Sequence, residues 1–155
     1  MRLLFKQRFL SWFASYDIYD EAGNTVYTVK GQLSWGHRLE IYDAYGQNIG
    51  TVKEEIFTLL PRCVLYINGQ PVGQIKKEFT LFKPVYTLDC NGWRVEGDFL
   101  GWDYQVTDPA GSPVMQALRQ LNWTDTFIID IPDPANALIA LMVVLAIDIA
   151  NAKNN

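Results

Sequence analysis

The 155-residue chain has little charge and few of the residue types that most often carry chemistry. Only 19% of its residues are charged, and 13 lysines and arginines face 17 acidic residues, for a formal net charge of -4. The low charge content excludes an extended charged helix, and the 49% of hydrophobic residues excludes intrinsic disorder. Because a general nucleic-acid-binding protein normally carries a basic excess, we expect no nucleic-acid partner. The length fits a single domain over residues 1–155.

Cysteine and histidine are also scarce. Cys63 and Cys90 are too few for a disulfide framework and too isolated for a metal-binding knuckle, so we expect both to be reduced and buried. The single histidine, His37, cannot complete a typical zinc site, and no serine or cysteine motif accompanies it. These facts favour a structural or surface role for His37 over a general base. The chain also lacks a glycine-rich phosphate-binding loop. We therefore expect no cofactor and no enzymatic activity, and we predict no catalytic, cofactor-binding or metal-binding residue.

The chain has one long hydrophobic run and no recognisable targeting segment. Arg2, Lys6 and Arg8 interrupt the apolar residues at the start, which argues against a secretory signal and makes the cytoplasm the expected location. The run from Ala137 to Ile147 contains no polar side chain. At about 1.5 Å per residue it would cross roughly half of a bilayer core. We therefore predict no transmembrane span.

Regularly spaced glycines predict a series of β-hairpins. Each lies in a short polar turn, and three positions later stands a valine or an isoleucine. The glycines are Gly23, Gly46, Gly69, Gly92 and Gly111. Glycine supplies the positive φ that such turns need, and β-branched residues favour the flanking strands. The hairpins provide two strands each, and the segments 3–9 and 125–131 add one strand each. We therefore expect about twelve antiparallel strands between residues 3 and 131.

The last part of the sequence predicts a helix over residues 133–151. Asp133 before Pro134 is a typical N-cap followed by proline at the first helical position. Because the following run is apolar on every side, this helix has to be buried on every side. A closed sheet of twelve strands has a backbone diameter of roughly 24 Å, which accommodates a helix about 10–12 Å wide. The sequence thus predicts a mainly β fold, a closed antiparallel barrel around a hydrophobic C-terminal helix.

Five segments together resemble the LURP-one-related family. They are LLFKQRF near the start, YDIYDEAGNTVYTVKG (16–31), LEIYDAYGQNIGTVKEE (39–55), LYINGQPVGQIKKEFT (65–80) and DTFIIDIPDPANALIALMVVLAIDIA (125–150). The resemblance implies a twelve-stranded barrel around a hydrophobic C-terminal helix, related to the tubby C-terminal and phospholipid scramblase domains. Tubby-type domains bind phosphoinositides and scramblases act on membrane lipids. The resemblance implies no catalytic chemistry, and it assigns no binding residue to this chain.

Acidic residues recur at the predicted turns and near the end of the helix. Asp20, Asp43, Asp89 and Asp108 could together suggest calcium, but an aspartate that opens a turn also accepts hydrogen bonds from its own backbone. We favour the turn interpretation. Asp148 follows the apolar run and would be half-buried at one barrel mouth, where a carboxylate could serve a site, cap a neighbouring chain or face water.

Three lysines recur in the same register as the turns. Lys30, Lys53 and Lys76 each stand seven positions after one of the first three turn glycines, which places them two strands apart, at intervals of roughly 10 Å. Extended by Lys77, they would form a row able to bind an anionic lipid head group or a phosphate. The alternative is a set of solvated strand ends, with Glu54, Glu55 and Glu78 offsetting much of the field.

The aromatic residues fit two interpretations, and the function stays open between several classes. Trp93, Trp102, Tyr104 and Trp123 could line the barrel or edge a ligand cleft. Our first hypothesis is a non-enzymatic binding or scaffold module, cytoplasmic or peripheral at a membrane, whose partner is an anionic phosphoinositide-like lipid or a protein. The alternatives are a small-ligand or hydrolytic site at a barrel mouth, using Asp148 or His37, and a structural role in assembly. The oligomeric state is not predicted.

Overall fold

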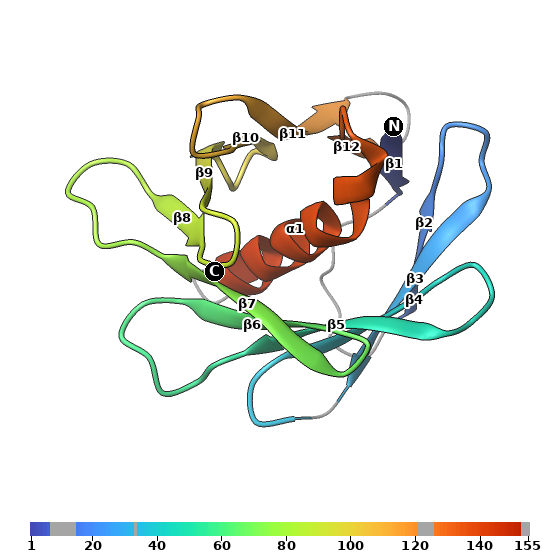
Figure 1. Cartoon of the computed structure of the whole chain (residues 1–155), viewed down its shortest axis with the longest axis horizontal. Helices are drawn as coiled ribbons and strands as arrows, with labels where there is room; N and C mark the ends of the chain where they lie inside the picture. The colour runs from blue at the N-terminus through green and yellow to red at the C-terminus, as the bar shows by residue number, and fades with distance from the viewer. Residues whose placement is uncertain (7–14, 33, 121–125, 153–155) are drawn as a thin grey trace.

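The computed structural model describes residues 1–6, 15–32, 34–120 and 126–152, and it contains a β-barrel and a C-terminal helix (Figure 1). The strands are β1 (Arg2–Phe5), β2 (Ser15–Tyr19), β3 (Thr25–Gln32), β4 (Arg38–Tyr42), β5 (Asn48–Glu54), β6 (Arg62–Ile67), β7 (Gln70–Lys77), β8 (Val85–Leu88), β9 (Trp93–Asp98), β10 (Asp103–Thr107), β11 (Pro113–Gln120) and β12 (Thr126–Asp130). The helical segments are the 3₁₀-helix η1 (Pro134–Asn136) and the helix α1 (Ala137–Ala152).

The strands form one closed antiparallel barrel, as predicted. Each strand pairs with the next one along the chain, and β1 closes the ring by pairing with β12 on one side and β2 on the other. In the closing pair, Leu3 lies opposite Ile129 and Phe5 opposite Phe127. The predicted first strand is observed over Arg2–Phe5, while residues 7–9 of that prediction and residue 125 of the last strand lie outside the described residues.

The five predicted hairpin turns are all present. Their glycines have φ angles between +72° and +87°, in the region that favours glycine. Three of the turns share one device, in which the aspartate at the start of the turn accepts hydrogen bonds from backbone N–H groups two and four residues later, at 2.9–3.0 Å. The repeated glycine spacing therefore corresponds to repeated turn geometry.

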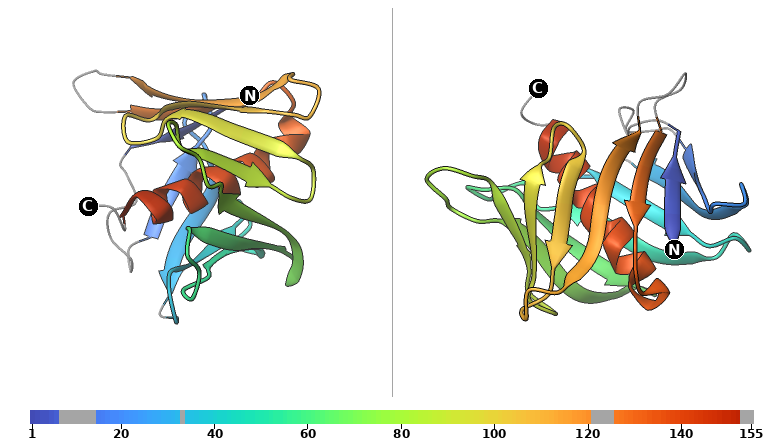
Figure 2. Two further views of the ribbon diagram at one scale, coloured as in Figure 1. Left: turned by 90° about the vertical axis from the view of Figure 1, so that its left-hand side faces the viewer. Right: turned by 90° about the horizontal axis from the view of Figure 1, so that it is seen from above.

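The C-terminal helix fills the barrel, as Figures 1 and 2 show from three directions. Asp133 accepts a 3.0 Å hydrogen bond from the Ala135 N–H, and a 3₁₀ turn precedes the α-helix proper. Every residue from Ala140 to Ile147 is buried, which covers all sides of the helix. By length and composition the segment Pro134–Ala152 could cross a membrane. In this structure, its apolar side chains pack against the inward-facing residues of the barrel.

The two ends of the barrel differ in their connections. The turn end carries the five hairpin turns and the entrance to α1, with the connections at residues 20–24, 43–47, 68–69, 89–92, 108–112 and 131–136. Among the described residues, the loop end carries the longer loops 55–61 and 78–84 and the shorter connections 34–37 and 99–102. In Figure 1 the β5–β6 and β7–β8 loops project on the side where α1 ends, and the β2–β3 and β4–β5 turns lie on the opposite side.

Alanine substitutions on three faces of α1 test its enclosure. Leu141, Met142 and Ile147 point in three different directions around the helix, and each is 0% exposed. We expect each change to alanine to lower the free energy of unfolding by about 2–5 kcal/mol, because each leaves a cavity in a filled core. Urea denaturation measures the effect. If one of the three substitutions left the free energy of unfolding nearly unchanged, that face of α1 would not be enclosed.

Candidate functional site

Three of the four predicted lysines lie together on the outer wall of the barrel. Lys30, Lys53 and Lys76 stand on β3, β5 and β7, and the residue just before each of them is buried in the core. Because side chains alternate along a strand, the lysines point outward. Each stands within two residues of the strand terminus at the loop end.

Two arginines fill the gaps between these lysines. Arg38 on β4 lies directly opposite Lys53, and Arg62 on β6 lies directly opposite Lys76. We call the five residues Lys30, Arg38, Lys53, Arg62 and Lys76 the basic row. Like charges directly opposite each other destabilise a sheet, so packing alone does not account for two such pairs. The sequence analysis missed the arginines, although each opens the strand that precedes or follows a lysine strand.

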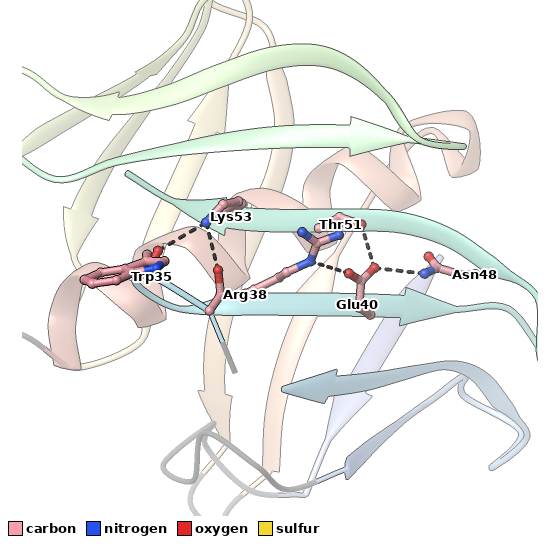
Figure 3. Close-up of polar contacts among 7 residues, drawn as sticks. Trp35, Arg38, Glu40, Asn48, Thr51 and Lys53 are labelled. Atoms are coloured by element: carbon pink, nitrogen blue, oxygen red, sulfur yellow. Dashed lines mark hydrogen bonds and ion pairs between the residues drawn. The ribbon is translucent and has the colours of Figure 1, made fainter. Parts of the chain in front are cut away.

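A buried glutamate stands beside the row (Figure 3). Glu40 on β4 is 2% exposed, and its carboxylate accepts hydrogen bonds from Arg38 Nε at 2.6 Å, Thr51 Oγ1 at 2.6 Å and Asn48 Nδ2 at 2.9 Å. Burial alone would raise its pKa, but the three hydrogen bonds and the charge of Arg38 outweigh burial and lower the pKa below its ordinary value of 4.5. Glu40 is therefore a carboxylate that positions Arg38.

The other members of the basic row are more weakly engaged. Lys53 Nζ donates to Ser34 Oγ at 2.9 Å and to the Trp35 carbonyl at 3.1 Å, while Lys76 lies 3.9 Å from Glu78. The Lys30 ammonium lies over the Tyr42 ring, 4.9 Å from its centre, in a cation–π contact. Arg62 is exposed and has no ion pair within the described part of the chain. The row thus keeps donors available for an external anion.

The fourth predicted lysine does not extend the row. Lys77 follows Lys76 directly and lies opposite Tyr86, which is buried, so its side chain belongs to the other face of β7. It lines a hollow of about 320 Å³ at the loop end, together with Leu100 and Asn151. The prediction that Lys77 extends the row is therefore wrong, because neighbouring residues on a strand point to opposite faces of the sheet.

Exposed apolar side chains gather on the loop end. Nine large hydrophobic side chains are exposed among the described residues, and seven of them lie in the four connections at this end. We call the seven the apolar crown: Trp35, Phe57, Leu59, Phe79, Leu81, Phe82 and Leu100. Trp35 and Phe57 line one shared hollow of about 320 Å³, although they come from different loops. Large exposed apolar patches are typical of interaction surfaces. Sequence reasoning missed it because these residues have no periodic spacing.

The turn end has the opposite character. Its connections carry Asp20, Glu21, Asp43, Asp89, Asp108 and Asp133, and they contain no lysine or arginine. The turn interpretation of the aspartates is supported by their contacts: hydrogen bonds from the turn backbone engage Asp20, Asp43 and Asp108, and Asp89 accepts the Gln74 N–H at 2.7 Å. The backbone and side-chain bonds to Asp20 lower its pKa against a smaller opposing effect of desolvation.

Aromatic rings pack inside the barrel near its mouth at the loop end. Trp102 packs edge-on against Phe5 and Phe127, with ring centroids 5.5 and 5.0 Å apart, and it is 1% exposed. Trp93 and Tyr104 are buried as well, which fits the interpretation that they line the barrel, although Tyr104 also lines a hollow of about 440 Å³. Trp123 lies outside the described residues.

The remaining candidate residues take part in structural contacts. Asp148 is half-buried near this mouth, as expected, and its Oδ1 accepts the indole N–H of Trp102 at 3.2 Å. His37 Nδ1 lies 3.1 Å from Glu54 Oε1, which ties the β3–β4 loop to the end of β5. Both cysteines are free, but only Cys63 is buried; Cys90 is exposed in the β8–β9 turn.

One hollow lies between β9, β10 and the β7–β8 loop, near the loop end. It has a volume of about 440 Å³, is open to solvent and is lined by Lys83, Glu96, Asp98 and Asp103 among others. Neither Asp148 nor His37 lines it. The described residues contain no group of three or more potential metal ligands.

A closed twelve-stranded barrel filled by its C-terminal helix, with its charged and apolar features on the outside, defines the class of protein. The family model described as LURP-one-related matches residues 1–148, and the chain belongs to this family, as its resemblance predicted. The X-ray structure of a protein from Arabidopsis thaliana is similar in fold, with a TM-score of 0.67 and 20% identity over 96% of this chain and 90% of that chain. No curated protein matches this chain.

Replacing Glu40 by glutamine tests the buried carboxylate. We expect the free energy of unfolding to fall by about 1.5 kcal/mol near neutral pH, because charge-assisted hydrogen bonds are lost. Since the pKa of Glu40 is lower in the folded than in the unfolded chain, its stabilising contribution is present above the ordinary value of 4.5 and is lost as the pH falls through the folded value. The difference in the free energy of unfolding between the native protein and Glu40→Gln should therefore shrink as the pH falls below 4.5.

The matched control for this prediction is Glu96→Gln. Glu96 is exposed and pairs with Arg94 on the surface, so we expect its replacement to change stability by no more than about 0.5 kcal/mol. Urea denaturation at several pH values compares the two variants. A cost for Glu40→Gln no larger than that for Glu96→Gln would contradict the assigned role.

Proposed function

We propose that the protein is a non-enzymatic binding module that docks on an anionic phospholipid surface through its basic row. The observation that carries the proposal is the presence of two pairs of opposed cations, Arg38 with Lys53 and Arg62 with Lys76, on one wall of the barrel. Such pairs are unfavourable in the isolated sheet and become favourable next to negative charge. Phosphate oxygens of lipid head groups are acceptors that lysine and arginine bind well.

The charges near the row leave it positive. Glu40 is committed to Arg38, Thr51 and Asn48, so it offsets one charge of the row. Glu54 is buried and lies beside His37, away from the outer wall. Glu78 lies next to Lys76, and Glu55 lines a hollow together with Lys53, so the five cations face three acidic side chains near the row. The overall charge of -4 therefore coexists with a local positive surface.

We also propose a cytoplasmic protein that associates peripherally with membranes. The free cysteines fit a reducing compartment, and anionic lipid is abundant in the cytoplasmic leaflet. A protein partner with an acidic surface is the alternative that uses the same basic row. A hydrolytic site built on Asp148 or His37 has less support, because both residues are engaged in structural contacts.

Vesicle co-sedimentation tests this function. We expect the protein to bind vesicles that contain phosphatidylserine, to ignore pure phosphatidylcholine vesicles, and to lose affinity as salt is raised. The double variant Arg62→Gln/Lys76→Gln should bind roughly 30-fold more weakly, because each cation near an anionic membrane contributes about 1 kcal/mol.

Arg2→Gln/Arg94→Gln is the matched control, since it removes the same charge from residues near the turn end. We expect it to bind like the native protein. Equal losses in the two double variants, or no binding to anionic vesicles, would contradict the proposal. Binding to an acidic protein without binding to anionic vesicles would favour the alternative partner.

A further inference from the structure

We propose that the apolar crown inserts into the head-group region of the anionic bilayer, so that the barrel docks with its loop end toward the membrane and its turn end away from it. This inference deepens the proposed function and rests on it. The basic row attracts the anionic surface, and the crown sets the depth and orientation of the bound protein.

The exposed apolar side chains are concentrated at the loop end of the barrel. Phe57 and Leu59 are 94% and 98% exposed, and Phe82 is 93% exposed, so these side chains contribute little to the core. Within the described ranges, the two exposed large hydrophobic residues outside the crown, Met1 and Tyr45, both lie at the turn end. Four separate connections thus present apolar side chains on one end of the barrel.

Backbone and side-chain hydrogen bonds hold the loops of the crown at their bases. The Glu55 N–H donates to the Arg62 carbonyl at 2.9 Å, and the Lys77 N–H donates to the Pro61 carbonyl at 2.9 Å. Lys53 holds the β3–β4 loop through the Trp35 carbonyl. Anchored loop bases leave the side chains of the crown free to enter another phase without unfolding of the barrel.

The charges at the two ends of the barrel favour the same orientation on an anionic membrane. The basic row stands within two residues of the loop end, so its cations lie around the base of the crown. The acidic connections of the turn end are repelled by an anionic surface. Both forces therefore orient the same end toward the membrane. Tryptophan and lysine are also side chains that suit the interface between head groups and acyl chains.

The same charge pattern disfavours a second copy of the chain as the occupant. In a two-fold dimer the same patch is contributed by both subunits. A dimer through the crown would bring two basic rows toward each other. An anionic bilayer supplies the opposite charge and an apolar phase together, so it satisfies both features of the loop end.

Site-specific labelling tests the orientation. Cys63 is buried and Cys90 is exposed at the turn end, so the native protein takes a thiol-reactive fluorophore at Cys90. The variant Leu59→Cys/Cys90→Ser takes it in the crown. On phosphatidylserine vesicles that carry nitroxide-labelled acyl chains, we expect a blue shift and strong quenching of the label at position 59 and neither effect at position 90.

An affinity measurement accompanies the labelling. We expect Leu59→Ser/Phe82→Ser to weaken vesicle binding by at least about tenfold, because two apolar side chains no longer leave water. Tyr45→Ser, at an exposed residue of the turn end, is the control and should bind normally. Because the replaced side chains are more than 90% exposed, thermal unfolding should be the same for all variants.

The outcomes separate the two proposals. If native protein binds anionic vesicles but the label at position 59 stays in water and the crown variant binds normally, the insertion is wrong and the proposed function stands. If native protein fails to bind, both are wrong. If sedimentation without lipid shows a dimer that Leu59→Ser/Phe82→Ser abolishes, the crown is an interface between copies, which also overturns the insertion.

Discussion

The enclosure of an apolar helix is the constraint on which the rest of the structure depends. From Ala140 to Ile147 every residue of α1 is buried, whichever way its side chain points. A helix of this kind needs partners all round, and a closed sheet supplies them. Closure also pairs the first strand with the last and removes the free edges that would otherwise pair with other chains.

Because α1 fills the barrel, the residues that could contact a partner lie on its outer surface. The interior holds α1, and Trp102 and its aromatic neighbours pack inside the mouth at the loop end. Asp148, half-buried near that mouth, accepts the Trp102 N–H. The wall and the loops then remain as the surfaces for a partner, and these carry the basic row and the apolar crown. The family establishes the fold, while the proposed lipid surface rests on the arrangement of these side chains.

The antiparallel connectivity makes the two ends of the barrel unequal. Tight turns need glycine together with aspartate or asparagine, whose side chains cap the turn, so the turn end is acidic for local structural reasons. The longer connections have no such requirement, and here they carry exposed apolar side chains. The two ends of this barrel therefore differ in charge and in exposed apolar side chains, and the proposed orientation on a membrane rests on that difference.

The strand number, the closed barrel and the buried helix are predictable from local patterns: glycine spacing marks the turns, and alternation and an all-round apolar run indicate burial. The sequence also placed Lys30, Lys53 and Lys76 on one wall, since they share a register with the turns. It did not separate Lys77 from them, because that depends on which face of β7 points inward. Nor did it indicate that Arg38 and Arg62 complete the row, that Trp93, Trp102 and Tyr104 are core residues, or that the crown exists. Those features depend on which residues of different strands and loops become neighbours in the folded barrel, and local sequence patterns do not report that.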